Sequence, residues 1–162
     1  TEGIGDSQLP RSAQLINKSN QFHLTTTRYT EAQLLNMIND ESYFCRYFTL
    51  QDRFGNNGLI SVIIMKKIDF ESLIIDTWVM SCRVLNRTVE QAVFSYILQK
   101  TDKKTIQGEY IPTEKNNLVK NLYNSLGFSL VPKTSENKKE LWRYSINSEE
   151  TNPLMHFATI TE

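Results

Sequence analysis

The chain has 162 residues, 40% of them hydrophobic and 22% charged, with 18 basic and 18 acidic residues and a formal net charge of zero. This length and composition predict a single globular domain that is large enough to bury its own core. Because there is no basic excess, we expect no nucleic-acid partner. No apolar run approaches the roughly 20 residues that span a bilayer, and residues 1–8 lack the layout of a signal peptide. Two cysteines, Cys45 and Cys82, fit a reducing compartment, so we expect a cytoplasmic protein that does not bind a membrane.

The order of predicted elements is typical of an α+β domain with a mostly antiparallel sheet and helices on both faces. Residues 1–8 are polar and read as a linker or a truncated N-terminal strand, so we expect the natural protein to continue upstream. Apolar periodicity, turn signals and helix caps predict helices over 9–20 and 30–38, strands over 43–50, 59–65 and 73–82, a helix over 88–99, a strand over 105–111, a helix over 115–126, and strands over 128–131 and 141–146. We place the domain at 9–148, followed by a C-terminal tail over 149–162.

Three local patterns refine these elements. The segments 59–65 and 73–82 are apolar on both faces, which predicts central strands covered on each side. Gly55-Asn56-Asn57-Gly58 is a turn signal before the first of them, and its Asn-Gly pair is a strong hairpin signal. Gly127 follows the helix over 115–126 at a plausible position for a left-handed helix end.

The segment Trp78 to Glu90 carries the first chemical signal. A buried strand runs into a polar turn and then a helix, whose first backbone N–H groups favour an anion such as a diphosphate. Arg83 and Arg87 add positive charge on either side of the turn. The alternative is an ordinary strand–helix corner flanked by two arginines.

Two motifs resemble those of the Gcn5-related N-acetyltransferases (GNAT). The family's acyl-carrier loop reads Arg or Gln, two residues, Gly, one residue, and Gly or Ala, and the run Arg83 to Thr88 is similar to it. Leu122 to Phe128 resembles the family's helix end, and Asn116 lies seven residues before Tyr123, as the family's asparagine does. The resemblance implies a GNAT-like fold and a site for CoA or a carrier-bound phosphopantetheine made by Ser81, Arg83, Val84, Leu85, Asn86, Arg87, Thr88 and Asn116.

Asn86 and Thr88 occupy the two glycine positions of this loop. Asparagine adopts a left-handed conformation more readily than most residues, whereas threonine is bulkier and narrows the approach of a diphosphate to the backbone.

Two residues are candidates for catalysis. Tyr123 lies where related acetyltransferases place a general acid, although a core tyrosine would give the same pattern. Cys82 lies beside Arg83, which would favour a thiolate acting as nucleophile or acyl acceptor, although strand cysteines are usually inert. The histidines have no second ligand at a metal-binding spacing, so no metal site is predicted.

Four sequence blocks occur together and narrow the resemblance. They are 17–26, 52–59, 78–87 and 108–116. In this order they resemble the C-terminal domain of the FkbH-like proteins, which pair a haloacid-dehalogenase (HAD)-like phosphatase domain with a GNAT-like module. The resemblance implies glyceryl transfer from 1,3-bisphosphoglycerate to an acyl carrier protein, for methoxymalonyl-type polyketide extender units. It also implies an upstream phosphatase domain as a partner, because the Asp-x-Asp motif of that half is absent from this sequence.

Two alternatives stay open at this point. The first alternative is a stand-alone CoA-dependent N-acetyltransferase that acts on an amine. The second is a non-catalytic domain that docks the carrier protein. The sequence does not decide whether the chain is an enzyme; if it is active, it is a transferase. Binding to CoA, to a carrier protein or to neither would separate these readings.

Overall fold

The computed structural model describes residues 2–85, 87–132 and 139–146, which form a seven-stranded sheet of order β1-β2-β3-β4-β5-β7-β6. Within these residues, β4 and β5 are parallel and the other neighbouring strands are antiparallel. The strands are β1 (Glu2–Gly3), β2 (Tyr43–Asp52), β3 (Gly55–Lys67), β4 (Ser72–Met80), β5 (Thr105–Tyr110), β6 (Ser129–Leu130) and β7 (Glu140–Ser145). The helices are α1 (Leu9–Lys18), α2 (Glu31–Ile38), α3 (Val89–Lys100) and α4 (Leu122–Ser125).

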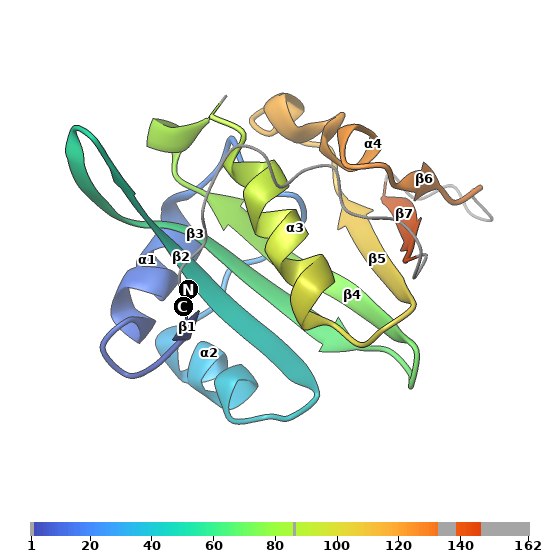
Figure 1. Cartoon of the computed structure of the whole chain (residues 1–162), viewed down its shortest axis with the longest axis horizontal. Helices are drawn as coiled ribbons and strands as arrows, with labels where there is room; N and C mark the ends of the chain where they lie inside the picture. Colours follow the sequence, from blue (N-terminus) through green and yellow to red (C-terminus); the bar gives the residue numbers. More distant parts are fainter. Residues whose placement is uncertain (1, 86, 133–138, 147–162) are drawn as a thin grey trace.

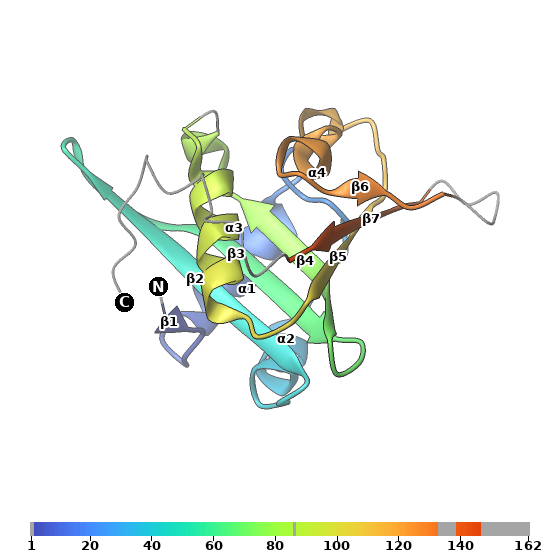
Figure 2. The same cartoon turned by 45° about the vertical axis from the view of Figure 1, so that its right-hand side comes forward.

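The sheet carries α3 on one face and α1 and α2 on the other (Figure 1, Figure 2). In β3, Ile63 packs in the core cluster that contains Phe94 of α3. Its neighbours Val62 and Ile64 pack in the cluster that contains Ile16 of α1. Successive side chains of a strand point to opposite faces, so helices on both faces account for the continuous apolar run. The predicted α+β fold with helices on both faces is confirmed.

The turn between β2 and β3 lies earlier than predicted. Asp52 pairs with Gly55, so the two-residue loop is Arg53-Phe54, closed by the Phe54 N–H donating to Asp52 Oδ1 at 2.8 Å. Asn57 and Gly58 instead lie inside β3, where the register shifts and Gly58 has a φ of 65°. The predicted Asn-Gly turn is therefore wrong, and the glycine serves a β-bulge.

Of the two alternatives for residues 1–8, the structure has a strand: Glu2–Gly3 pairs with β2 as a short edge strand. One strand boundary in the middle of the chain differs from expectation. The strand predicted over 73–82 ends at Met80, because the chain then enters a 3-10 turn, Cys82–Val84, which the Ser81 hydroxyl caps at the Arg83 N–H. Cys82 is thus an exposed turn residue and not a strand residue.

The helix predicted over 115–126 is broken. A 3-10 turn covers Asn117–Val119, and α4 covers only Leu122–Ser125. The Asn116 side chain bonds back to Ile111 and Thr113, which holds residues 111–116 outside the helix. The predicted helix end is confirmed: Gly127 has a φ of 86°, and the Phe128 N–H donates to the Tyr123 carbonyl at 2.9 Å.

Candidate functional site

The parallel strands β4 and β5 separate toward one end of the sheet. Their pairing ends at Ile75 and Gly108, while β4 continues to Met80 and β5 to Tyr110. Figure 1 shows the two strands diverging. Beyond Ile75, the edge of β4 that faces β5 therefore has no strand beside it. Polar backbone groups on such an edge must find other partners.

The chain's own residues Phe22–Thr25, here called the gap segment, provide those partners. The Met80 N–H donates to the Phe22 carbonyl at 3.3 Å, and the Thr25 hydroxyl donates to the Asp76 carbonyl at 3.0 Å. On the other side, the Ile111 N–H donates to the Leu24 carbonyl at 2.9 Å. The gap segment therefore joins the diverging strands and is buried along its whole length.

Asn116 holds the gap segment from the side of β5. Its Nδ2 donates to the carbonyls of His23 and Ile111, both at 3.0 Å. Its Oδ1 accepts from the Thr113 N–H at 2.7 Å and from the Tyr110 hydroxyl at 3.4 Å. The side chain is fully buried. The structure therefore places this predicted cofactor-binding residue inside the protein's own hydrogen-bond network.

His23 stabilises the turn that follows. Its Nδ1 accepts from the Thr26 N–H at 3.0 Å, which leaves the proton on Nε2, and Nε2 donates to the Thr27 carbonyl at 2.9 Å. Burial, with the nearby Arg28 guanidinium, lowers the pKa of His23 from 6.5 to about 4. Thr26 has a φ of 58°, a left-handed conformation that is costly for a β-branched residue.

Acidification is expected to destabilise the protein through His23. Between pH 6.5 and about 4 the unfolded chain binds a proton at His23 that the folded protein excludes, so stability falls as pH decreases across this window. The loss approaches about 3 kcal/mol. Urea unfolding measured across the window tests this, with His23→Asn as a non-titrating control that keeps an acceptor for the Thr26 N–H. An equal pH slope in the variant would assign the effect to other groups.

The predicted anion loop is held against the β2–β3 hairpin. The Arg83 Nη2 donates to the Asn57 carbonyl at 3.2 Å and its Nε to the Ser81 hydroxyl at 3.2 Å. The Arg87 Nη1 lies 3.1 Å from the Asp52 carboxylate. The Phe54 N–H, and after it Asn57 and Arg87, hold the pKa of Asp52 below its usual value. Both arginines therefore have partners within the protein.

The first turn of α3 differs from the helix N-termini that bind anions, because the protein's own side chains already occupy it. Thr88 precedes the helix with a φ of 60°, and its hydroxyl donates to the Arg87 carbonyl and not to the helix. Glu90 lies in the first turn, and its buried Oε2 has no hydrogen-bond partner. This carboxylate already occupies the positive end of the helix dipole. The remaining loop residues are half-buried Leu85 and buried Val84, and Asn86 lies outside the described residues.

Tyr123 lies in the core. Its ring packs against Phe128 and Trp142, and its hydroxyl donates to the Glu109 carbonyl at 3.4 Å. Burial raises the pKa of the phenol above its ordinary value. The ring also lies directly on Gly108, where a Cβ would meet the ring carbon Cζ at 2.3 Å. The structure thus gives Tyr123 a packing contact with β5 and no opening to solvent.

Two cavities meet at Phe22 of the gap segment. One, of 670 Å³, is lined by residues from the end of α1, the end of β4 and the loop after β5, among them Lys18, Cys82 and Lys115. The other, of 160 Å³, lies between the first turn of α3 and α4 and is lined by Leu85, Glu90 and other residues. Phe22 lines both cavities. Neither Phe22 nor Glu90 was a predicted site residue; the only signal for Phe22 was its place in one of the four sequence blocks.

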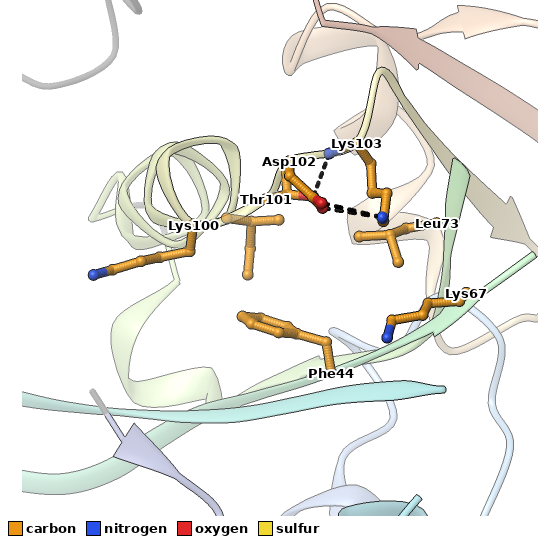
Figure 3. Close-up of a pocket in the computed structure, with 8 residues that line it drawn as sticks. Phe44, Lys67, Leu73, Lys100, Thr101, Asp102 and Lys103 are labelled. Atoms are coloured by element: carbon orange, nitrogen blue, oxygen red, sulfur yellow. Dashed lines mark hydrogen bonds and ion pairs between the residues drawn. The ribbon is translucent and has the colours of Figure 1, made fainter. Parts of the chain in front are cut away.

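A third hollow, of 80 Å³, lies at the opposite end of α3 (Figure 3). Its lining includes Phe44, Leu73, Lys67 and Lys103, and Lys103 pairs with Asp102. It contains none of the predicted site residues. In the part of the chain that the structure describes, no cluster of side chains suits a metal ion, and no helix is long and apolar enough to cross a membrane.

No protein family and no curated protein matches the sequence. Solved structures do match. The ribosomal-protein-S18-alanine N-acetyltransferase from Escherichia coli is 14% identical, with a TM-score of 0.62 over 93% of this chain and 96% of that chain. The GNAT domain of PAT from S. lividans is 10% identical, with a TM-score of 0.69 over 90% and 89%. Spermidine N-acetyltransferase from Vibrio cholerae, in complex with CoA and spermine, is 14% identical, with a TM-score of 0.59 over 88% and 90%.

At these identities the likeness concerns the fold. The chain has the GNAT fold, as the sequence motifs predicted. The structure bonds Arg83 to Ser81 and holds Arg83 and Arg87 against the β2–β3 hairpin, and it places Asn116 and Tyr123 inside the protein.

Proposed function

We propose that this chain is the acyltransferase-like, carrier-side module of an FkbH-like protein in the cytoplasm. It binds the phosphopantetheine thioester of an acyl carrier protein during glyceryl transfer from 1,3-bisphosphoglycerate, toward methoxymalonyl-type polyketide extender units. A HAD-like phosphatase domain upstream is its partner. The GNAT fold and the four sequence blocks support this assignment.

The charge pairing in the loop before α3 carries the preference for a carrier protein over free CoA. Asp52 pairs with Arg87, and Glu90 faces the adjacent cavity, so the loop offers little net positive charge. CoA brings a diphosphate and a further ribose phosphate, whereas a carrier-bound arm brings a single phosphodiester. A nearly neutral loop gives little electrostatic attraction for the several phosphates of CoA, so the carrier-bound arm, with one phosphodiester, is the better match.

The two cavities suggest roles for individual residues. The cavity between α3 and α4 is mostly apolar and suits the arm, with Arg83 and Arg87 near its phosphate. The larger cleft, with Lys18, Lys115 and the exposed thiol of Cys82, suits the group being transferred. Tyr123 positions β5 through Gly108.

Calorimetric titration tests the proposal. We expect the pantetheinylated carrier protein to bind at least about tenfold more tightly than acetyl-CoA or the carrier without its arm, a difference of about 1.4 kcal/mol. Arg83→Ala should weaken carrier binding, because the phosphate loses a cation. Tight acetyl-CoA binding that Arg83→Ala abolishes, with no carrier binding, would instead identify a CoA-dependent N-acetyltransferase.

Asp52→Asn should change the ligand preference of the loop. The amide oxygen keeps an acceptor for the Phe54 N–H, but it no longer neutralises Arg87. Acetyl-CoA should therefore bind more tightly, on the order of fivefold at low salt, and the gain should shrink as salt is added. An unchanged affinity for acetyl-CoA would show that Arg87 does not meet the phosphates.

A non-catalytic docking domain is the second candidate, favoured by the burial of the Tyr123 hydroxyl. A transfer assay with a carrier protein and an acyl donor separates the two. Under the first candidate, transfer occurs and survives Tyr123→Phe, because the ring contact with Gly108 is kept. Binding without any transfer would favour the docking domain.

A further inference from the structure

The gap segment occupies the strand edge that best suits an amide-bearing arm. Phosphopantetheine is an extended chain with amide groups, and such chains pair with a free strand edge as peptides do. The edge in this site that no strand covers is that of β4 beyond Ile75. Its Met80 N–H and Asp76 carbonyl are already bonded to Phe22 and Thr25.

Phe22 also separates the two cavities of the site. Its ring is 4% exposed, lines the 160 Å³ cavity and the 670 Å³ cleft, and packs edge-on against Trp78 with centroids 5.8 Å apart. An arm that enters between α3 and α4 must therefore pass this ring to bring its thioester to Cys82.

The gap segment is irregular in backbone conformation and ends in strain. It has no helix or strand of its own, and it pairs with β4 through one β-bridge, His23 with Val79, and the bonds of Phe22 and Thr25. Thr26, at its end, is held at a φ of 58°, a backbone state that costs on the order of 1–3 kcal/mol. Strained residues of this kind cluster at clamps and switches because movement relieves the strain.

We propose that the gap segment is an autoinhibitory contact: it holds the β4 edge in place of the thioester arm, and Phe22 is the gate between the two cavities. The arm displaces the segment and takes over the Met80 N–H, and the shifted ring opens a passage across the sheet. This inference rests on the proposed arm-binding function.

The gate predicts how ligands compete. If only a small fraction of the protein has the gap segment displaced, the apparent affinity for the arm is the intrinsic affinity multiplied by that fraction. A carrier protein offsets this through its own docking contacts, whereas a free arm does not. Weakening the gap segment should therefore tighten binding of free pantetheine, which lacks phosphates and is insensitive to the charge of the loop.

The test compares Thr25→Val with Thr27→Val. Thr25→Val removes the hydroxyl bond to Asp76 without changing the side chain's shape, whereas Thr27 is exposed and its hydroxyl holds no described contact with the segment. We expect Thr25→Val to bind pantetheine about fivefold more tightly than wild type, and Thr27→Val to match wild type. Phe22→Leu should also tighten binding. Equal affinity in all four proteins would overturn the gate.

Hydrogen exchange on the same proteins separates the gate hypothesis from the proposed arm-binding function. Pantetheine should speed the exchange of the Thr26 and Ile111 amides, which lose their acceptors His23 and Leu24, while the Met80 amide stays protected. Binding without faster exchange at Thr26 and Ile111 would overturn the gate and leave the proposed function standing. No binding of pantetheine or carrier protein to wild type, Thr25→Val or Phe22→Leu would overturn both.

Discussion

Replacing Gly108 with alanine is expected to destabilise the protein by at least about 3 kcal/mol. The new Cβ would lie 2.3 Å from Cζ and 2.5 Å from the hydroxyl oxygen of Tyr123, well inside van der Waals contact. The ring cannot retreat easily, because Phe128 and Trp142 pack on it and the whole side chain is buried. Urea or thermal unfolding measures the loss.

Two controls identify the clash as the cause. Gly5→Ala places its Cβ in open space and should change stability by no more than about 0.5 kcal/mol. In a Tyr123→Leu background, which removes the ring, Gly108→Ala should cost much less than in the wild type, so the two changes couple strongly. Additive losses would show that the glycine is required for another reason.

The parts of the fold that follow from local patterns were predictable. The apolar run of β3 identified a strand covered on both faces, and Gly127 identified a helix end, because each depends on neighbouring residues alone. Thr30 also begins α2 as predicted, through a capping box with Gln33. These signals lie within a few residues of the feature that they predict.

The two main failures have different physical origins, one in a contact between distant segments and one in a competing local turn. Asn116 lies at a helical spacing from Tyr123, but its amide bonds to His23, 93 residues away in sequence, and the helix begins later. Asn57-Gly58 has the composition of a turn, but Asp52 bonds to Phe54 and closes the hairpin first. No periodicity in the sequence encodes the first contact, which is tertiary, and in the second an Asp side chain that bonds two residues on forms a turn before the Asn-Gly pair.

The four sequence blocks acquire a spatial meaning in the structure. The blocks over 17–26 and 108–116 meet through the bonds from Asn116 and Ile111 to the gap segment. The blocks over 52–59 and 78–87 meet through Arg87 with Asp52 and Arg83 with Asn57. One pair closes the gap between β4 and β5, and the other neutralises the loop before α3. Both therefore act on the same proposed arm site, from its two ends.

Replacing Asn116 with alanine is expected to cost about 4 kcal/mol, because several buried backbone groups lose their partners at once. The carbonyls of His23 and Ile111 lose a donor, and the Thr113 N–H loses its acceptor. Urea unfolding should show the loss, whereas Asn117→Ala at the exposed next residue should change stability by no more than about 0.5 kcal/mol. A loss near 1 kcal/mol would show that water replaces the amide.

Asn116→Asp sharpens the same experiment, because it keeps the size of the side chain and changes only its hydrogen-bonding groups. The carboxylate accepts from the Thr113 N–H but faces the His23 and Ile111 carbonyls without a proton to donate. A protonated carboxyl can donate to one of them, so burial raises the pKa of the introduced acid. The stability lost on substitution should therefore grow as pH rises through that raised pKa, opposite to the His23 effect. A pH-independent loss would show that the site stays hydrated and does not hold the gap segment in place.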